Sequence, residues 1–204
     1  SYAIELDWRK DNPAKAIKRN RERERDAWLD EHDLPLFLKA LEKTEGPYSE
    51  IVRFLLVTGW RISEARGLRW EMVDLKRLTA ALPDSKTGAQ VRALSADAAT
   101  IVDRQSHKSG YIFSKRGTMP LDGRTVRQLL SDLCVEAKIK PISPHALRHS
   151  AASWAAIGGA SAHELREAFG WRGLAMPSRY VSRAESLARR GVERTADAIN
   201  IFQK

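Results

Sequence analysis

Hydrophobic residues first recur at helical spacing in the segment 34–41. Leucine and phenylalanine stand there three or four positions apart, which is the spacing of one helix face. Either Asp30 or Asp33 can cap the start of this helix, and Pro35 falls in its first turn, where a missing N–H costs little. A glycine–proline pair at 46–47 then breaks the pattern, so the sequence predicts that the helix ends before it.

Further helices follow the same periodicity. A second apolar run, residues 51–57, ends at Gly59, and Ser63 can cap a short helix after it. Beyond Ser95 the chain returns to helical patterning, and a Gly-Gly pair separates two of the later segments. Helices are predicted at 122–138, 144–158, 161–169 and about 184–200.

Residues 70–95 instead alternate between short apolar segments and polar turns. The segments 70–73, 78–82 and 90–94 have the length of strands, and the sequence PDSKTG at 83–88 is typical of a hairpin connection. The whole pattern predicts a mainly α fold with a small antiparallel β-sheet, an α+β class.

Composition then narrows the class of partner. The 204-residue chain carries a formal net charge of +9, which favours an anionic partner such as nucleic acid, although charge alone does not exclude a basic protein without such a partner. The single cysteine, Cys134, excludes an intrachain disulfide and a cysteine-rich metal cluster. No apolar run approaches the roughly 18 residues that cross a bilayer, so no membrane partner is expected.

The two ends of the chain differ from its middle. Residues 1–29 are dense in charges of both signs, which is typical of a solvated linker and, less often, of a basic strap along a phosphate backbone. We expect an N-terminal extension over 1–29, one domain over 30–183 and a C-terminal tail helix over 184–204.

Arginines at two separated positions have the chemistry to bind a phosphodiester. Phosphorus under attack gains charge on its non-bridging oxygens, and a guanidinium matches those oxygens and stays ionised. Arg61 has Glu64 three residues on, which can hold its guanidinium in place. Arg148 follows His145 by three residues, so both share one helix face, and His145 can exchange a proton with an attacking phenol. The adjacent His149 is expected to point elsewhere and to support the site by packing.

Three further side chains complete a candidate site. Lys86, at the predicted hairpin tip, can give a proton to a leaving 5′-oxygen. Tyr180 can attack phosphorus and form a phosphotyrosyl ester, and the indole N–H of Trp171 can donate to a phosphate oxygen or to the tyrosine. Pro177 argues against a regular helix immediately before Tyr180. Each residue alone has an ordinary alternative as a surface charge, a turn lysine or a packed aromatic ring.

Metal chemistry is not indicated. The segment HELRE at 163–167 begins like a zinc-binding HExxH helix but has glutamate where the second histidine is required. No phosphate-binding glycine loop and no cluster of paired carboxylates occurs either, so the sequence predicts no metal and no nucleotide cofactor.

In order and spacing, these residues resemble the catalytic domain of the tyrosine recombinases, the phage integrase family, over roughly residues 30–185. TGWRISEARGLRW resembles the first arginine box of that family, PHALRHSAASW its HxxRH box, and FGWRGLAMPSRY the final box that leads to the nucleophile. The family more often has histidine where Trp171 stands, which implies hydrogen bonding and packing at this position rather than proton transfer.

The resemblance implies a role for each basic residue. Arg61 and Arg148 would clamp the scissile phosphate, and Glu64 would be a supporting acid beside them. Lys86 would protonate the leaving 5′-hydroxyl, and His145 would serve in proton transfer and phosphate binding. Tyr180 would form the 3′-phosphotyrosine, without a metal or nucleotide cofactor.

The function implied is that of a site-specific DNA recombinase, a phage or mobile-element integrase of the prokaryotic cytoplasm, associated with the nucleoid. Its partners would be double-stranded DNA, other copies of itself in a tetramer on DNA, and accessory DNA-bending proteins; alone it would be a monomer or weak oligomer. The alternatives are a type IB topoisomerase-like enzyme and a non-catalytic DNA-binding module of the same fold.

The resemblance also bears on the ends of the chain. The N-terminal DNA-binding domains of a full-length integrase are missing, which implies an isolated catalytic domain with weak DNA affinity and residues 1–29 as an interdomain linker. In the C-terminal tail, Ile199, Ile201 and Phe202 are expected to bury against protein, either in the same subunit or in a neighbouring one.

Overall fold

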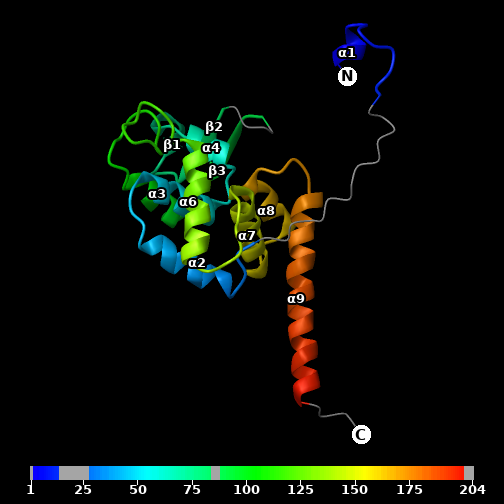
Figure 1. Cartoon of the computed structure of the whole chain (residues 1–204). Helices are drawn as coiled ribbons and strands as arrows, with labels where there is room; N and C mark the ends of the chain where they lie inside the picture. The colour runs from blue at the N-terminus through cyan, green and yellow to red at the C-terminus, as the bar shows by residue number, and fades with distance from the viewer. Residues whose placement is uncertain (1, 14–27, 84–87, 200–204) are drawn as a thin grey trace.

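The computed structural model describes residues 2–13, 28–83 and 88–199, and it is mainly helical with one small sheet (Figure 1). This agrees with the predicted fold class. None of the described helices has the length and apolar character that a bilayer crossing needs. The elements are α1 (Tyr2–Glu5), α2 (Asp33–Glu42), α3 (Pro47–Thr58), α4 (Ile62–Gly67), the 3₁₀ turn η1 (Trp70–Met72), β1 (Val73–Asp74), β2 (Thr79–Leu82), β3 (Gln90–Ala93), α5 (Ala96–Asp103), α6 (Gly123–Glu136), α7 (Pro144–Ile157), α8 (Ala162–Phe169) and α9 (Ala175–Ile199).

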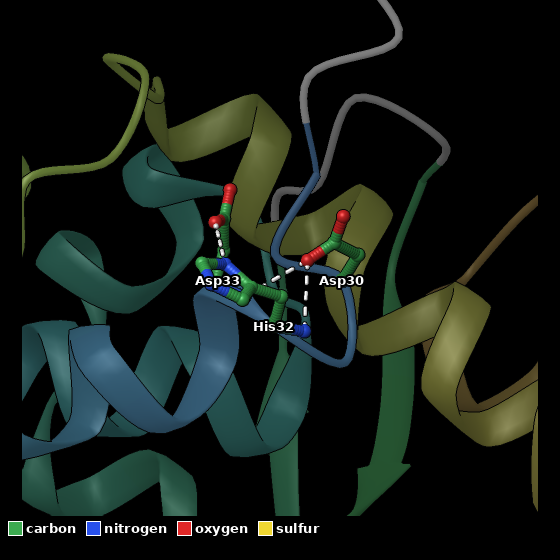
Figure 2. A group of neighbouring side chains, drawn as sticks. All are labelled: Asp30, His32 and Asp33. Atoms are coloured by element: carbon green, nitrogen blue, oxygen red, sulfur yellow. Dashed lines mark hydrogen bonds and ion pairs between the residues drawn. The ribbon is translucent and has the colours of Figure 1, made fainter.

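Asp30 organises the start of α2 (Figure 2). Its Oδ1 accepts the backbone N–H groups of His32 at 3.0 Å and of Asp33 at 2.8 Å, which satisfies donors that the first helical turn leaves open. Of the two predicted capping residues, Asp30 rather than Asp33 accepts these N–H groups, although it lies two residues before His32, which is the N-cap of α2. His32 Nδ1 lies 3.1 Å from Asp33 Oδ1, so these hydrogen bonds account for the grouping of the three side chains.

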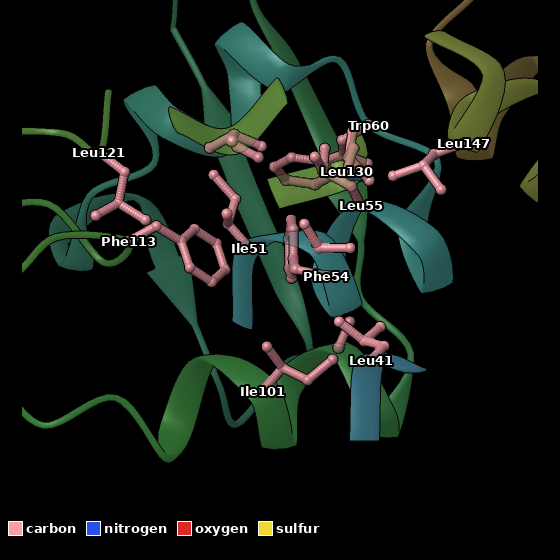
Figure 3. Packing of buried hydrophobic residues seen from close by; sticks show 14 of the residues in the cluster. Leu41, Ile51, Phe54, Leu55, Trp60, Ile101, Phe113, Leu121, Leu130 and Leu147 are labelled. Atoms are coloured by element: carbon pink, nitrogen blue, oxygen red, sulfur yellow. The ribbon is translucent and has the colours of Figure 1, made fainter. Parts of the chain in front are cut away.

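The central helix of the core is α3. Ile51 and Phe54 are fully buried there, because α4, α5, α6 and α7 all pack against this helix. The ring of Phe54 lies 5.3 Å from that of Trp60 and 5.0 Å from that of Phe113 (Figure 3). The helix ends at Gly59, as predicted, and the left-handed φ of +60° at this glycine turns the chain toward α4.

The sheet has the order β1-β2-β3 and is antiparallel throughout. β2 and β3 pair from Thr79↔Ala93 to Leu82↔Gln90, so they form the predicted hairpin, although residues 84–87 lie outside the described ranges. The first predicted strand is largely wrong. Its residues 70–72 form η1, in which the Met72 N–H donates to the Arg69 carbonyl at 3.0 Å, and only 73–74 pair with β2.

The helices α7, α8 and α9 enclose a second cluster of buried residues, which includes Leu165, Phe169 and Tyr180. The predicted helices at 122–138, 144–158 and 161–169 agree with α6, α7 and α8 to within two residues at each end. The last prediction is wrong at its start, because α9 begins at Ala175 and runs through Tyr180 without a break. Pro177 lies in the first turn, where no helical N–H is needed, and so does not prevent the helix.

Leu29 anchors the N-terminal side of the domain to α7. Its side chain is fully buried, its N–H donates to Ser150 Oγ at 2.8 Å, and its carbonyl accepts from Trp154 Nε1 at 2.8 Å. The ring of Trp28 packs 5.9 Å from that of Trp154. Contact with the helical body therefore starts just before the predicted domain start at residue 30, whereas the charged segment 14–27 lies outside the described residues.

Beyond the second cluster, α9 continues away from the body of the molecule (Figure 1). Every side chain from Glu185 to Thr195 is exposed. The contacts predicted for Ile199, Ile201 and Phe202 fall outside the described side chains and stay a prediction.

Candidate active site

The first arginine of the site stands where α3 turns into α4. Arg61 is the N-cap of α4, and its backbone N–H donates to Glu64 Oε2 at 2.9 Å. Its guanidinium Nη1 donates to the other oxygen, Glu64 Oε1, at 2.7 Å. Glu64 thus holds both the backbone and the side chain of Arg61, as the spacing of the two residues predicted.

A second arginine, Arg92 on β3, binds the same carboxylate. Its Nη1 lies 2.9 Å from Glu64 Oε2 and its Nη2 lies 3.0 Å from Glu64 Oε1. Burial by itself would raise the pKa of Glu64, but the hydrogen bonds from Arg92 and from the Arg61 backbone outweigh it, so the pKa is lowered. Glu64 therefore stays ionised at neutral pH.

Sequence reasoning missed Arg92. The signal was its place in a strand, since side chains alternate between the two faces and Arg92 shares a face with Leu94. Leu94 is buried at 4% exposure and Arg92 at 2%, so both point into the domain. A charged residue at an inward-facing strand position needs a buried partner, and Glu64 is that partner.

The third arginine is Arg148 in the second turn of α7, only 4% exposed. It donates from Nη1 to the Gly59 carbonyl at 2.8 Å and from Nη2 to the Phe169 carbonyl at 2.7 Å. Burial and the nearby charge of Arg61 lower the pKa of Arg148 to about 10, so it remains a cation at neutral pH. These two carbonyls belong to the first and last boxes, and Arg148 joins them.

His145 lies one helical turn before His149 on α7, and their rings meet edge to face with centroids 4.3 Å apart. Partial desolvation lowers the pKa of His145, and the charges of Arg148 and Arg61 lower it further. The ring stays exposed to solvent and is neutral at pH 7, so it can accept a proton at the edge of the arginine pair.

Tyr180 lies in the first turns of α9 with only 8% of its surface exposed. Its hydroxyl shares a hydrogen bond with His149 Nδ1. His149 therefore faces the phenol, and the expectation that it points elsewhere is wrong, because the crossing of α7 and α9 brings together residues 31 positions apart. Burial raises the pKa of Tyr180, although the charges of Arg148 and Arg183 oppose the rise, so the phenol is protonated at neutral pH.

Trp171 is the centre of an aromatic stack. Its ring lies 5.0 Å from that of Phe169 at 11° and 5.6 Å from that of Tyr180 at 20°. The Arg148 guanidinium carbon lies 4.9 Å from the Trp171 ring centroid, a cation–π distance. Trp171 thus fixes the position of the phenol relative to Arg148 through packing.

The site as a whole is electropositive. Arg61, Arg92 and Arg148 surround the one carboxylate of Glu64, which leaves two uncompensated positive charges beside a protonated phenol. The geometry suits an anion with several oxygens, such as a phosphodiester. Within the described ranges, the carboxylate and imidazole groups of this site form no cluster with the spacing of metal ligands. Lys86 lies outside the described residues.

Comparison with known proteins gives one family. The model of the phage integrase family matches residues 27–186. The integrase of Salmonella phage P22 is 28% identical over 195 residues, which cover 87% of this chain and 49% of that protein. Prophage integrase IntZ of Escherichia coli (strain K12) is 34% identical over 89 residues, 42% of this chain and 22% of that protein. The chain thus spans half the length of these relatives or less.

Solved structures share the fold. The catalytic domain of bacteriophage HP1 integrase superposes with a TM-score of 0.61 at 24% identity, covering 83% of this chain and 95% of that one. The XerH site-specific recombinase bound to palindromic difH substrate gives a TM-score of 0.68 at 17% identity, covering 93% of this chain and 58% of that one.

Proposed function

Because the chain belongs to the phage integrase family, we propose that it is the catalytic domain of a site-specific recombinase, which cleaves and rejoins double-stranded DNA through a 3′-phosphotyrosyl bond to Tyr180. The observation that carries the proposal is the stack of Tyr180 on Trp171 and of Trp171 on Arg148. It holds a phenol beside a buried guanidinium that is anchored at both of its terminal nitrogens. A phosphate bound by Arg148 would therefore lie next to the nucleophile.

Cleavage would begin with attack of the Tyr180 oxygen on phosphorus. The Tyr180 O–P bond forms, the bond from phosphorus to the 5′-oxygen breaks, and the phosphate stays on the 3′ end as an ester of the tyrosine. Arg61 and Arg148 would neutralise the charge that grows on the non-bridging oxygens. Rejoining reverses these steps, with a 5′-hydroxyl as the attacking group.

Two protons move in this reaction. The phenol loses one, and an acceptor is at hand because His149 Nδ1 already shares a hydrogen bond with the hydroxyl. His145, which is neutral and packs edge to face against His149, would bind the phosphate and assist the transfer of this same proton. The leaving 5′-oxygen gains the other proton, and Lys86 is the proposed donor.

The partners follow from the same proposal. XerH has been solved bound to its difH substrate, and the Tn1549 transposon integrase in complex with circular intermediate DNA. We propose that this chain also binds double-stranded DNA, because it belongs to the same family and its site is electropositive. A tetramer on DNA, a monomer or weak oligomer without it, accessory DNA-bending proteins and a location on the prokaryotic nucleoid are further parts of the proposal.

The test traps the covalent intermediate. A pool of duplexes with a randomised centre, each nicked so that a short strand is lost after cleavage, is incubated with the 204-residue chain and EDTA and then denatured in SDS. We expect adducts whose DNA converges on one sequence, and none from Tyr180→Phe, which keeps the ring and loses the hydroxyl. No adduct from the wild type, or adducts from Tyr180→Phe, would refute the proposal. Adducts without sequence preference, together with relaxation of supercoiled DNA, would indicate a topoisomerase instead.

A further inference from the structure

We propose that Arg92 is a positioning residue of the cleavage site, which acts through Glu64 to fix the orientation of Arg61 and to limit how far Glu64 neutralises the charge of Arg61. The inference rests on the proposed function, because it concerns the same phosphate site. It begins from a buried contact: the side chains of Arg92 and Glu64 are only 1% and 6% exposed and share two nearly parallel hydrogen bonds of 2.9 and 3.0 Å.

Arg61 and Arg92 together fix the orientation of the Glu64 carboxylate. Each carboxylate oxygen accepts one bond from Arg92 and one from Arg61, at distances between 2.7 and 3.0 Å. A carboxylate held at four positions cannot rotate, so the Arg61 guanidinium is fixed in turn. Among the described residues Glu64 is the only ion-pair partner of Arg61, so the rest of that guanidinium can face a phosphate.

Arg92 is itself held on two sides. Its Nε and Nη2 donate to Gln90 Oε1 at 3.1 and 2.9 Å, and its guanidinium carbon lies 5.2 Å from the Trp60 ring centroid. On the other side it touches the turn after α8. A Cβ on Gly170 would lie 2.4 Å from Arg92 Nη2, so only glycine lets the chain pass this close.

The close approach of Arg92 to Gly170 brings the Glu64–Arg61 pair next to the segment that holds Arg148 and Tyr180. Gly170 lies between Phe169, whose carbonyl anchors Arg148, and Trp171, which stacks on the nucleophile. Arg92 therefore spaces the Glu64–Arg61 pair from the segment that positions Arg148 and the phenol. Its strand, β3, is also the one that follows the Lys86 hairpin in the sequence.

The charge of Arg92 indicates that this residue positions Arg61 and does not merely stabilise the fold. A buried ion pair contributes little net stability compared with apolar side chains of similar volume, so stability alone does not explain a buried arginine here. With Arg92 present, the single carboxylate of Glu64 is shared by two cations. Glu64 therefore neutralises Arg61 only in part, and the remaining positive charge can bind a phosphate. Without Arg92, Glu64 would face Arg61 alone in a buried place, where it is harder to ionise.

The test compares Arg92→Met and Arg92→Lys with Arg53→Met. Arg53, in the middle of α3, is the matched control because it also binds a glutamate, Glu50, and two backbone carbonyls, which belong to Leu41 and Thr44 and not to the candidate site. For each variant that keeps the wild-type circular dichroism spectrum, the single-turnover rate of adduct formation is measured between about pH 5 and 9. DNA affinity is measured separately by fluorescence anisotropy.

We expect Arg92→Met to lower the rate at neutral pH by about tenfold to a hundredfold, as a small misplacement of a reacting group does, with DNA affinity changed far less. The acid limb of its pH profile should move to higher pH, because Glu64 then protonates more readily. Arg92→Lys should recover part of the rate, and Arg53→Met should keep the wild-type profile. A wild-type rate and profile in Arg92→Met, or an identical loss in Arg53→Met, would overturn the inference.

Two further measurements keep the result decisive. If Arg92→Met does not fold, Arg92→Lys decides, since it keeps the buried charge: a wild-type rate and pH profile in that variant contradict the inference. If the wild type forms no adduct at all, the proposed function fails, and the titration of the Glu64 carboxyl carbon by NMR still tests Arg92. We expect its pKa to rise in the folded Arg92 variant, and an unchanged titration would count against the link between the two residues.

Discussion

Substitution of Gly59 by alanine tests how the first and last boxes are held together. Gly59 has φ +60°, and its carbonyl accepts a hydrogen bond from Arg148 Nη1 at 2.8 Å. A Cβ at this position would lie 2.1 Å from Cε1 of Phe169 and 2.8 Å from its Cδ1. The Phe169 carbonyl is the other anchor of Arg148, so the added methyl group strains both anchors at once.

The magnitude has two parts. A non-glycine residue in a left-handed conformation costs on the order of 1–3 kcal/mol. Ordinary carbon contacts need about 3.5–4.0 Å, so the Phe169 ring, 2.1 Å from the new Cβ, has to move by roughly 1.5 Å. Overpacking of this kind costs about 1–3 kcal/mol. The free energy of unfolding should therefore fall by about 2–6 kcal/mol in total.

Urea unfolding, followed by tryptophan fluorescence and far-UV circular dichroism, measures the change. The matched control is Gly159→Ala, because Gly159 has φ +94° and a Cβ there would meet no atom within 4 Å. The control should show the backbone cost alone, so Gly59→Ala should be less stable than it by about 1–3 kcal/mol. If the two variants lie within about 0.5 kcal/mol of each other, close contact with Phe169 is not what makes Gly59 necessary.

Three more predictions concern Leu29, His145 and Tyr180. Leu29→Ala should lower the free energy of unfolding by about 2–5 kcal/mol, because the side chain is fully buried. The control Leu36→Ala, at a side chain that is 39% exposed, should change it by about 0.5 kcal/mol or less. Equal urea midpoints for the two variants would contradict the anchoring of Leu29 on α7. Because the pKa of His145 is lowered in the folded protein, the imidazole binds a proton more tightly in the unfolded chain. Stability should therefore fall as the pH drops below about 6.5. In urea unfolding midpoints measured from pH 8 to 5, His145→Gln should show a smaller loss than the wild type. Burial raises the pKa of Tyr180, so its ionisation, measured as the difference in absorbance at 295 nm between the wild type and Tyr180→Phe, should occur above the ordinary value of 10. Stability should fall as the pH rises past 10, because the phenol of the unfolded chain ionises first. A difference titration with its midpoint below 10 would contradict the burial of Tyr180.

Local signals predicted most of the helices. The apolar period and the glycine pair at 158–159 predicted the bounds of α7 and α8, and the structure adds that Ser143 and Ser161 cap these two helices. Pro177 misled for a local reason as well. Proline is excluded from a helix interior but not from its first turn, and the sequence alone did not show that α9 begins only two residues earlier.

Order and spacing also predicted two pairs of neighbouring residues in the candidate site. Arg61 with Glu64, and His145 with Arg148, are pairs within one turn of helix, so their proximity is built into the helical repeat. Arg92 and His149 were harder to place. Arg92 meets Glu64 across 28 positions, and His149 meets Tyr180 across 31, so both contacts depend on how separate elements cross.

By itself, the sequence determined the bounds of α6, α7 and α8 to within two residues and predicted which side chains have the chemistry to bind a phosphate, because periodicity, helix breakers and short motifs are set by neighbours along the chain. Only the tertiary structure decided that Arg92 is buried against Glu64 and that the Tyr180 hydroxyl lies on His149 rather than in solvent. Those contacts require the inward face of β3 and the crossing of α7 with α9. Each is settled by packing of the whole domain, in which a buried charge must find a partner and an aromatic ring must find a stack.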